Sequence, residues 1–422
     1  MILLYSEIQS ARLAFAVKAF FEPYGISVEL TSNKEDFLQE TERIRICYGA
    51  KNLFPEVLNI PSEGLLFETG TREMEIKAQR NFNWNWDVFS WTFFFLSQYE
   101  EYLPCERDQY GRRLGTSSWL HKENHLREPL IDRWRMQLMH DLSLKFPEII
   151  FPKTHSYQAI TIDVDSAFAY KHKGFYRTTG GMVKDVLHGR FKNLWNRLQT
   201  LAGFKHDEFD TYEAFEKIAE HHHVKLIWFF LLADFRGEDI SIPYNQRALR
   251  ELVRRLNKKY IVGIHPGLKS NDDPAILKQE VHRLKHIIRK DVLHSRQHFI
   301  KFDILETYDR LIDAGIEHEY SVGFHDVIGF KAATGWPFPY YDLRSESTRD
   351  LTLHPFVAMD ATLKRYMKLS PEVAFDVLRE IKQTCWHLKS PFVLLWHNET
   401  LSDTHGWEGY GQLLEDITVE PF

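Results

Sequence analysis

The feature that most constrains the fold of this chain is a regular alternation of short apolar runs and helical segments from about residue 155 onward. Parallel strands joined by helices produce this rhythm, and its length fits a (β/α) barrel. The strands are expected at residues 158–162, 225–232, 260–264, 319–323 and 391–396, with helices at 211–220, 245–256, 274–288 and 371–387. We therefore expect an α/β fold with a distorted, seven-stranded (β/α) barrel.

The chain before this barrel has a different organisation. Residues 1–86 alternate apolar runs, at 2–5, 26–30 and 44–47, with amphipathic stretches, which predicts a small α/β domain. Residues 87–154 turn helical and then charged, which predicts a helical connecting region packed on either domain. Two Phe-Pro pairs near residue 150 mark the end of this region, so the barrel is expected at residues 155–422.

Composition excludes several classes of protein. The 59 acidic against 53 basic residues give a net charge of −6, which argues against a nucleic-acid-binding protein. The most apolar windows are far shorter than the roughly 20 residues that cross a bilayer, so no membrane span is expected. Three widely spaced cysteines and a start without an export signal indicate free thiols and a cytoplasmic location.

Ionisable residues follow the predicted strands. Asp163 and Asp165 come after the first strand, His265 after the third and His397 after the last. The C-terminal ends of barrel strands converge on one face, where such folds place their active sites. Two nearby carboxylates repel each other, and a divalent cation beside them would reduce this repulsion. One carboxylate can then bind the metal while the other acts as a base. Imidazole is the usual ligand for zinc and similar ions, and a second histidine could donate a proton.

Other features leave alternatives open. Asp234 and Asp326 also follow strands, but we favour a helix-capping role for both. A glycoside hydrolase that pairs Asp163 with either of them would need carboxyl groups about 5–9 Å apart. The aromatic content of 14% fits a large core or a carbohydrate-handling surface. Residues 336–341 are equally compatible with a sugar-stacking platform and a packed loop.

The order of these motifs resembles that of polysaccharide deacetylases of the NodB-homology type. The matching segments are residues 161–165 (Thr-Ile-Asp-Val-Asp), 263–265 (Gly-Ile-His), 295–299 (with one arginine) and 395–397 (Leu-Trp-His). Residues 94–104, 108–112 and 129–134 resemble the additional domain that precedes this barrel in a bacterial subgroup of uncharacterised members.

The resemblance implies a role for each residue. Asp163 matches the catalytic base, Arg296 the arginine that orients it, and His397 the histidine that protonates the leaving amine. Asp165 and His265 match metal ligands. The implied cofactor is a divalent metal, zinc before cobalt or nickel, and the implied partner is a carbohydrate or glycoconjugate substrate.

One position departs from the family pattern. The second histidine ligand lies four residues after the first, and that position holds Lys269. A protonated ammonium has no lone pair and cannot bind a metal. His298 can replace it, because it projects to the same side as Arg296 if that segment is extended. Ser270 and Asn271 are weaker candidates.

We therefore expect a metal-dependent hydrolase that cleaves an amide and removes an acetyl group from an N-acetylated amino sugar or related glycoconjugate. The alternative is a catalytically impaired deacetylase-like barrel that serves as a carbohydrate-binding or assembly protein, and Lys269 supports this alternative. The enzyme is favoured by the presence of the other matching residues, because a binding module does not need them. They are Asp163, Asp165, His265, Arg296 and His397.

Overall fold

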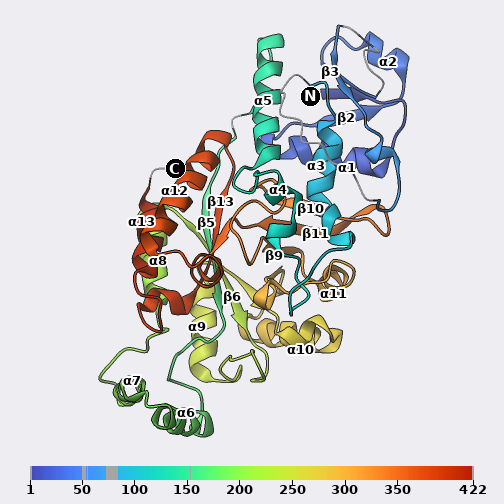
Figure 1. Cartoon of the computed structure of the whole chain (residues 1–422). Helices are drawn as coiled ribbons and strands as arrows, with labels where there is room; N and C mark the ends of the chain where they lie inside the picture. Colours follow the sequence, from blue (N-terminus) through green and yellow to red (C-terminus); the bar gives the residue numbers. More distant parts are fainter. Residues whose placement is uncertain (1, 50–53, 55, 73–83, 153, 421–422) are drawn as a thin grey trace.

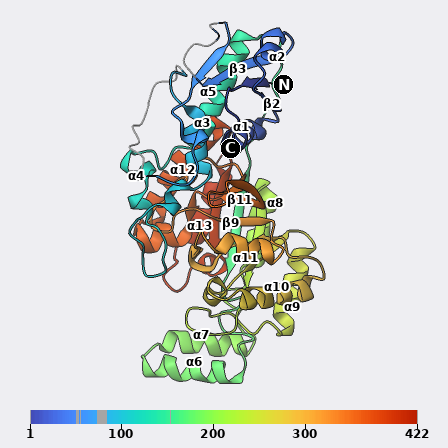
Figure 2. The same cartoon turned by 90° about the vertical axis from the view of Figure 1, so that its right-hand side faces the viewer.

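A computed structural model describes residues 2–49, 54, 56–72, 84–152 and 154–420. Its strands form two sheets, one of four strands near the N-terminus and one of nine strands in the remainder of the chain. The small sheet and its helices lie at one end of the molecule, the large sheet lies in the middle, and α6 and α7 lie at the opposite end (Figures 1 and 2).

The N-terminal sheet is wholly parallel, with the strand order β2-β1-β3-β4. The predicted strands at residues 2–5, 26–30 and 44–47 are confirmed as β1, β2 and β3, and β4 was not predicted. The elements are β1 (Ile2–Tyr5), α1 (Ala11–Phe21), β2 (Val28–Thr31), α2 (Lys34–Gln39), β3 (Ile44–Gly49) and β4 (Leu58–Pro61). Helices α3 (Val88–Leu96), α4 (Trp119–Lys122) and α5 (Leu130–Lys145) follow.

The large sheet is curled into a (β/α) barrel, as the sequence predicts. Its order is β10-β11-β9-β8-β7-β6-β5-β13-β12, and only β10 runs antiparallel to its neighbour among the described strands. The strands are β5 (Gln158–Val164), β6 (Lys225–Leu231), β7 (Ile261–His265), β8 (His294–Ser295), β9 (His318–Val322), β10 (Phe338–Asp342), β11 (Ser347–Pro355), β12 (Ala358–Met359) and β13 (Phe392–His397).

The long strand β11 and the two-residue strand β12 join the two sides of this barrel. Pro355, at the end of β11, pairs with β9, and three residues later Ala358 of β12 pairs with β13. Strands β11 and β12 therefore share one position, which gives seven parallel positions with β10 added at the edge. The two-residue strands β8 and β12 are too short for a periodic pattern and could not be predicted.

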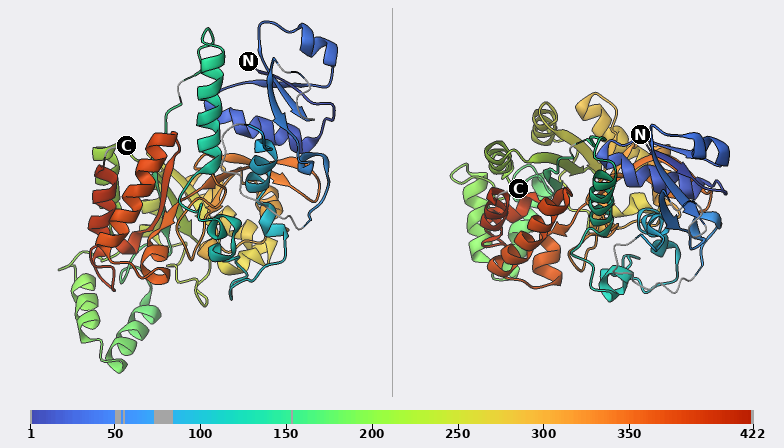
Figure 3. Two further views of the ribbon diagram at one scale, coloured as in Figure 1. Left: turned by 45° about the horizontal axis from the view of Figure 1, so that its top comes forward. Right: turned by 90° about the horizontal axis from the view of Figure 1, so that it is seen from above.

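Helices cover the outside of the barrel (Figure 3). The four predicted helices are confirmed as α8, α9, α10 and α12. Ser370 caps α12, and a proline follows it at the first helical position, as at many helix starts. The helices are α6 (Phe175–Leu187), α7 (Phe191–Leu201), α8 (Tyr212–His222), α9 (Arg247–Asn257), α10 (Pro274–Ile288), α11 (Thr307–Asp313), α12 (Pro371–Leu388) and α13 (Tyr410–Val419).

Aromatic side chains join the N-terminal part to the barrel. Every residue of α3 is buried, and its Phe93 ring lies 5.1 Å from Tyr341 of β10. Phe15 of α1 lies 4.9 Å from the same tyrosine. Tyr340 and Tyr341 are thus core residues, and Trp336 donates its indole N–H to the Lys389 carbonyl. These contacts favour packing over a sugar-stacking platform, but the predicted loop is wrong for residues 338–341, which belong to the strand β10.

Candidate metal centre

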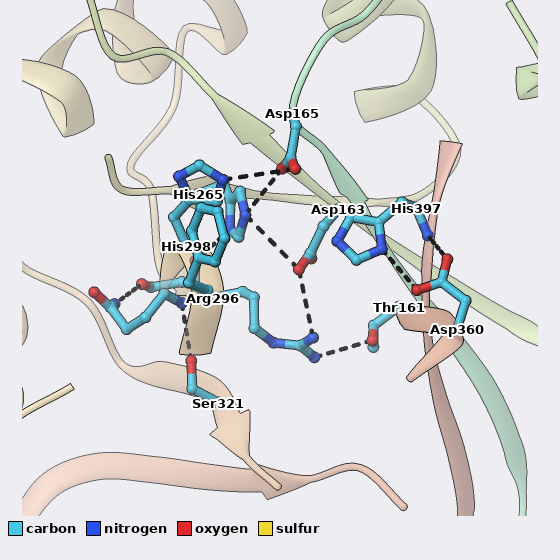
Figure 4. A network of polar contacts seen from close by, with 12 residues as sticks. Thr161, Asp163, Asp165, His265, Arg296, His298, Ser321, Asp360 and His397 are labelled. Atoms are coloured by element: carbon cyan, nitrogen blue, oxygen red, sulfur yellow. Dashed lines mark hydrogen bonds and ion pairs between the residues drawn. The ribbon is translucent and has the colours of Figure 1, made fainter. Parts of the chain in front are cut away.

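Neighbouring strands bring the candidate residues to one end of the barrel. In the parallel register, His397 at the end of β13 lies opposite Asp163 of β5, and His265 ends β7 one strand beyond β6. Asp165 lies two residues after Asp163 in the chain, and the two side chains point to the same side of the strand (Figure 4). Arg296, just after β8, completes the ring of side chains at this end.

Three of these side chains can hold a metal ion. The donor atoms of Asp165, His265 and His298 all lie within 4.8 Å of one another. The Nε2 atom of His265 is 3.3 Å from Asp165 Oδ1, and that of His298 is 3.6 Å from Asp165 Oδ2. His265 Nε2 and Asp165 Oδ1 are buried without a hydrogen-bond partner among the described residues. Buried polar atoms are normally satisfied, so a cation suits this group.

The hydrogen bonds on the far side of each ring direct the lone pairs toward the centre. His265 Nδ1 lies 2.6 Å from the carbonyl oxygen of Arg296, which can only accept, so Nδ1 carries the proton. His298 Nδ1 lies 2.9 Å from the carboxylate of Asp239. Both arrangements leave Nε2 available to a metal, and carboxylate or carbonyl partners of this kind orient histidine ligands in metal sites.

Surrounding charges set the proton affinities of this group. Burial would raise the pKa of Asp165, but the neighbouring His298 and His265 outweigh burial and hold it well below its ordinary value. Burial would lower the pKa of His298, but Asp165 and Asp239 raise it to about 9. A cation that takes the Nε2 lone pair of His298 must displace this proton, so its binding strengthens as the pH rises.

A left-handed turn places His298. The 3₁₀ turn His298–Ile300 follows β8, and its residues Phe299 and Ile300 have φ angles of +59° and +56°. Arg112, from the segment before the barrel, donates to the Phe299 carbonyl over 2.7 Å. The Tyr110 ring stacks on the Phe299 ring with centroids 4.9 Å apart. Residues far apart in the sequence thus hold this turn.

The other candidates for the third ligand lie elsewhere. Lys269 is exposed on the turn Leu268–Asn271. Ser270 donates its hydroxyl to Glu280, and Asn271 accepts from Thr307. His298, by contrast, lies in one group with Asp165 and His265.

Asp163 lies between the metal group and a buried arginine. Its Oδ2 atom is 3.8 Å from His265 Nε2 and 3.8 Å from Arg296 Nη1. Arg296 is fully buried and donates to the hydroxyl of Thr161 over 2.9 Å. Burial lowers the pKa of Arg296, and the charge of Asp163 opposes this effect. The arginine therefore supplies a fixed positive charge beside the Asp163 carboxylate.

His397 is held by a carboxylate that the sequence analysis missed. Its Nδ1 lies 2.8 Å from Asp360 Oδ1, and its backbone N–H donates to Asp360 Oδ2. Burial would lower the pKa of His397, but Asp360 outweighs it and raises the pKa to about 10. His397 is thus a cation near neutral pH and can give up a proton. Asp360 follows the two-residue strand β12, and Asp239 lies in a long loop, so no sequence pattern marked either residue.

These side chains open onto a pocket of about 690 Å³. Asp165, His298 and His397 line it together with Met359, Ala361 and Glu399. Aromatic rings and two arginines complete the wall, namely Phe299, Tyr366, Trp407, Arg112 and Arg365. The aromatic surface at the site therefore comes from these rings, and residues 336–341 do not line it.

The two aspartates considered for glycosidase chemistry have other partners. The Asp234 side chain is 76% exposed and pairs with Arg283. Asp326 accepts the backbone N–H of Gly115 over 2.8 Å and that of Thr116. These contacts are structural, and they remove the support for a carboxyl pair with Asp163.

Comparisons with known proteins concern two parts of the chain. Residues 2–147 match the model of DUF7033, a family of unknown function, which covers about a third of the chain. No curated protein matches the chain.

Several solved structures of polysaccharide deacetylases are similar to the chain in fold. A candidate polysaccharide deacetylase from Mycobacterium smegmatis is 11% identical, with 64% of this chain and 87% of that chain covered and a TM-score of 0.40. A polysaccharide deacetylase from Bacillus cereus is 13% identical, with 62% of this chain and 86% of that chain covered and a TM-score of 0.29. A mutant of a CE4 family pseudoenzyme with restored enzymatic activity is 12% identical, with 63% of each chain covered and a TM-score of 0.30. At these identities and scores the similarity assigns no activity to this chain.

Proposed function

We propose that the protein is a metal-dependent hydrolase that removes an acetyl group from an N-acetylated amino sugar or a related glycoconjugate. The observation that carries this proposal is the convergence of Asp165, His265 and His298, with both ring Nδ1 atoms engaged behind them. Two directed lone pairs and a carboxylate at the floor of a pocket form a donor set that suits zinc, with cobalt or nickel as substitutes.

Acid and base groups beside the metal group support hydrolysis. A bound divalent ion would polarise the amide carbonyl and make a water molecule more acidic. In this proposal Asp163, which lies next to Arg296, accepts the proton of the attacking water. His397, whose pKa Asp360 raises, protonates the leaving amine in this proposal. A pure binding protein has no use for a base and an acid at these two positions.

The pocket supports a small polar substrate with an apolar face. Aromatic rings and charged side chains line it together, as in many small-molecule sites. Tyr366, which is 42% exposed, offers a ring surface for the apolar side of a pyranose, and Arg365 and Glu399 offer polar contacts. The resemblance of the motifs to polysaccharide deacetylases adds the acetamido group as the reacting part.

Acetate release tests this proposal. The metal-loaded protein is incubated with N-acetylated amino sugars in free, nucleotide-linked and lipid-linked form, and acetate is quantified. We expect release by the unaltered protein and a loss of at least about a hundredfold in Asp163→Asn, with metal content retained. Lys269→Ala is the matched control and keeps full activity, because Lys269 is exposed away from the metal group. Acetate release unchanged in Asp163→Asn, or glycan binding without any release, would contradict the proposal.

A further inference from the structure

A helical hairpin projects from the body of the protein, at the end opposite the N-terminal sheet (Figures 1 and 3). It consists of α6 and α7 and is called the arm, residues 171–206. The arm is inserted between β5 and β6, directly after the strand that carries Asp163. It therefore belongs to the loops at the C-terminal ends of the barrel strands, where the metal group also lies.

The arm exposes large apolar side chains that soluble proteins usually bury. Tyr176 is 88% exposed, Leu187 77% and Trp195 62%. In α7, Phe191, Trp195 and Leu198 are four and three residues apart, so they share one face of the helix. Other exposed apolar residues of the arm are Phe175, Val183, Val186, Leu201 and Phe204. This many exposed apolar side chains on two adjacent helices indicate an interaction surface.

The arm is also strongly basic in an acidic protein. It has eight Lys or Arg residues and one acidic residue, a net charge of +7, whereas the whole chain has −6. Two of these cations are already paired, Arg197 with Asp185 at 2.9 Å and Lys205 with Glu208, beside the arm, at 3.0 Å. Lys184, Arg190 and Lys192 are exposed beside the apolar face. The arm thus offers cations and apolar groups together.

Buried contacts fix the base of the arm to the barrel. Asp207 accepts three consecutive backbone N–H groups, those of residues 169–171. Glu208 accepts from the Tyr170 hydroxyl and from Asn196 of α7. Arg177 of α6 donates to the carbonyls of residues 240 and 241. The arm is therefore held out from the body in a defined direction.

We propose that the arm docks the protein on the surface of an anionic lipid bilayer. Basic amphipathic helices with exposed Trp, Phe and Leu lie in the membrane interface, where apolar groups enter the headgroup region and cations contact anionic lipids. No helix among the described residues is long and apolar enough to cross a membrane, so the contact is peripheral. Membrane docking requires no catalysis, so this proposal is independent of the proposed hydrolase activity.

The charge and the side chains argue against other occupants. Two copies of an arm with a net charge of +7 would repel each other at a shared interface. A nucleic acid would satisfy the cations but would leave Val183, Val186 and Leu187 in water. An anionic bilayer satisfies both sets of groups.

Vesicle co-sedimentation tests this inference. The full chain is mixed with vesicles of phosphatidylcholine alone, or with about one quarter phosphatidylglycerol. We expect binding to the anionic vesicles only, with loss at high salt because ions screen the charges. The double variant Phe191→Ser/Trp195→Ser and the triple variant Lys184→Glu/Arg190→Glu/Lys192→Glu should each bind about tenfold more weakly.

Matched controls keep the test specific. Leu144→Ser and Ile150→Ser remove apolar side chains that are 70% and 94% exposed outside the arm, and they should bind as the unaltered protein does. Circular dichroism verifies that each variant is folded. The inference is overturned if anionic vesicles are not bound, or if both arm variants bind them normally. It is also overturned if the protein forms dimers that Trp195→Ser disrupts.

Discussion

At the scale of single residues, His298 explains how the chain can form a metal group although Lys269 replaces the expected ligand. Asp239 engages His298 Nδ1 at 2.9 Å, and this contact turns Nε2 toward Asp165. The histidine thus comes from the strand end next to His265 rather than from the loop after it. The two histidines and the aspartate expected from the sequence thus lie together, with the second histidine supplied by a different segment.

His397→Ala should separate proton donation from metal binding. His397 lies outside the three-residue metal group, so metal content should stay the same while acetate release falls by roughly 10²–10⁴-fold. His405→Ala is the control, because His405 also pairs with a carboxylate, that of Glu208, but does not line the pocket. Loss of metal in His397→Ala, or an unchanged rate, would contradict the role of His397 as the acid.

At the scale of elements, the turn after β8 depends on a segment that precedes the barrel. Two successive left-handed residues, Phe299 and Ile300, cost about 1–3 kcal/mol each. The hydrogen bond from Arg112 and the stacking of Tyr110 offset part of this cost. Tyr110 and Arg112 therefore act as positioning residues for His298.

Arg112→Ala should weaken metal binding by about 10–100-fold, because the turn can relax and move His298. Cobalt titration followed by visible absorption measures the affinity and reports the ligand geometry. Arg113→Ala is the matched control: Arg113 bonds to Glu100 rather than to Phe299, so its loss can lower stability but should leave the cobalt affinity unchanged. Equal cobalt affinities in the two variants would contradict the positioning role.

The contact between Glu208 and His405 should make the base of the arm sensitive to acid. The His405 ring lowers the pKa of Glu208 from 4.5 to about 2. A depressed carboxyl pKa stabilises the fold above pH 4.5, and this stabilisation is lost as the pH falls toward 2. The free energy of unfolding measured with urea should therefore be lower for Glu208→Gln than for the unaltered protein at pH 5. The two values should converge near pH 2. A constant difference across this range would contradict the assignment.

At the scale of the whole molecule, an ion pair and an aromatic cluster join the two sheets. Arg12 of α1 is almost fully buried and donates to Glu346, in the turn between β10 and β11, over 2.8 Å. Phe15 and Phe93 pack on Tyr341 beside this pair. The N-terminal part and the barrel are therefore expected to unfold as one unit.

Glu346→Ala should lower the free energy of unfolding by roughly 3 kcal/mol, because it leaves the buried Arg12 charge uncompensated. Glu29→Ala, which breaks the more exposed pair with Arg43, should change it much less. Far-ultraviolet circular dichroism and tryptophan fluorescence should report a single transition. Two separate transitions in the unaltered protein would contradict joint unfolding.

Sequence patterns could predict elements of this fold but not the contacts between them. The strands β5, β6, β7, β9 and β13 were predictable because each has an apolar run, and alternation placed Asp163 and Asp165 on one side. Asp239, Asp360 and Arg112 could not be found in this way, because only the folded chain brings them to the site. The exposed apolar face of the arm was missed for a related reason, since burial cannot be read from periodicity alone.

The metal content of the purified protein tests the central claim most directly. The protein is prepared without chelators or a histidine tag and analysed for elements, beside Asp165→Ala, His298→Ala and the control Lys269→Ala. The proposed site predicts about one equivalent of zinc or a similar ion in the unaltered protein and in Lys269→Ala, and a loss in the other two variants. Absence of metal after incubation with excess zinc, cobalt or nickel, or full metal content in His298→Ala, would contradict the proposed site.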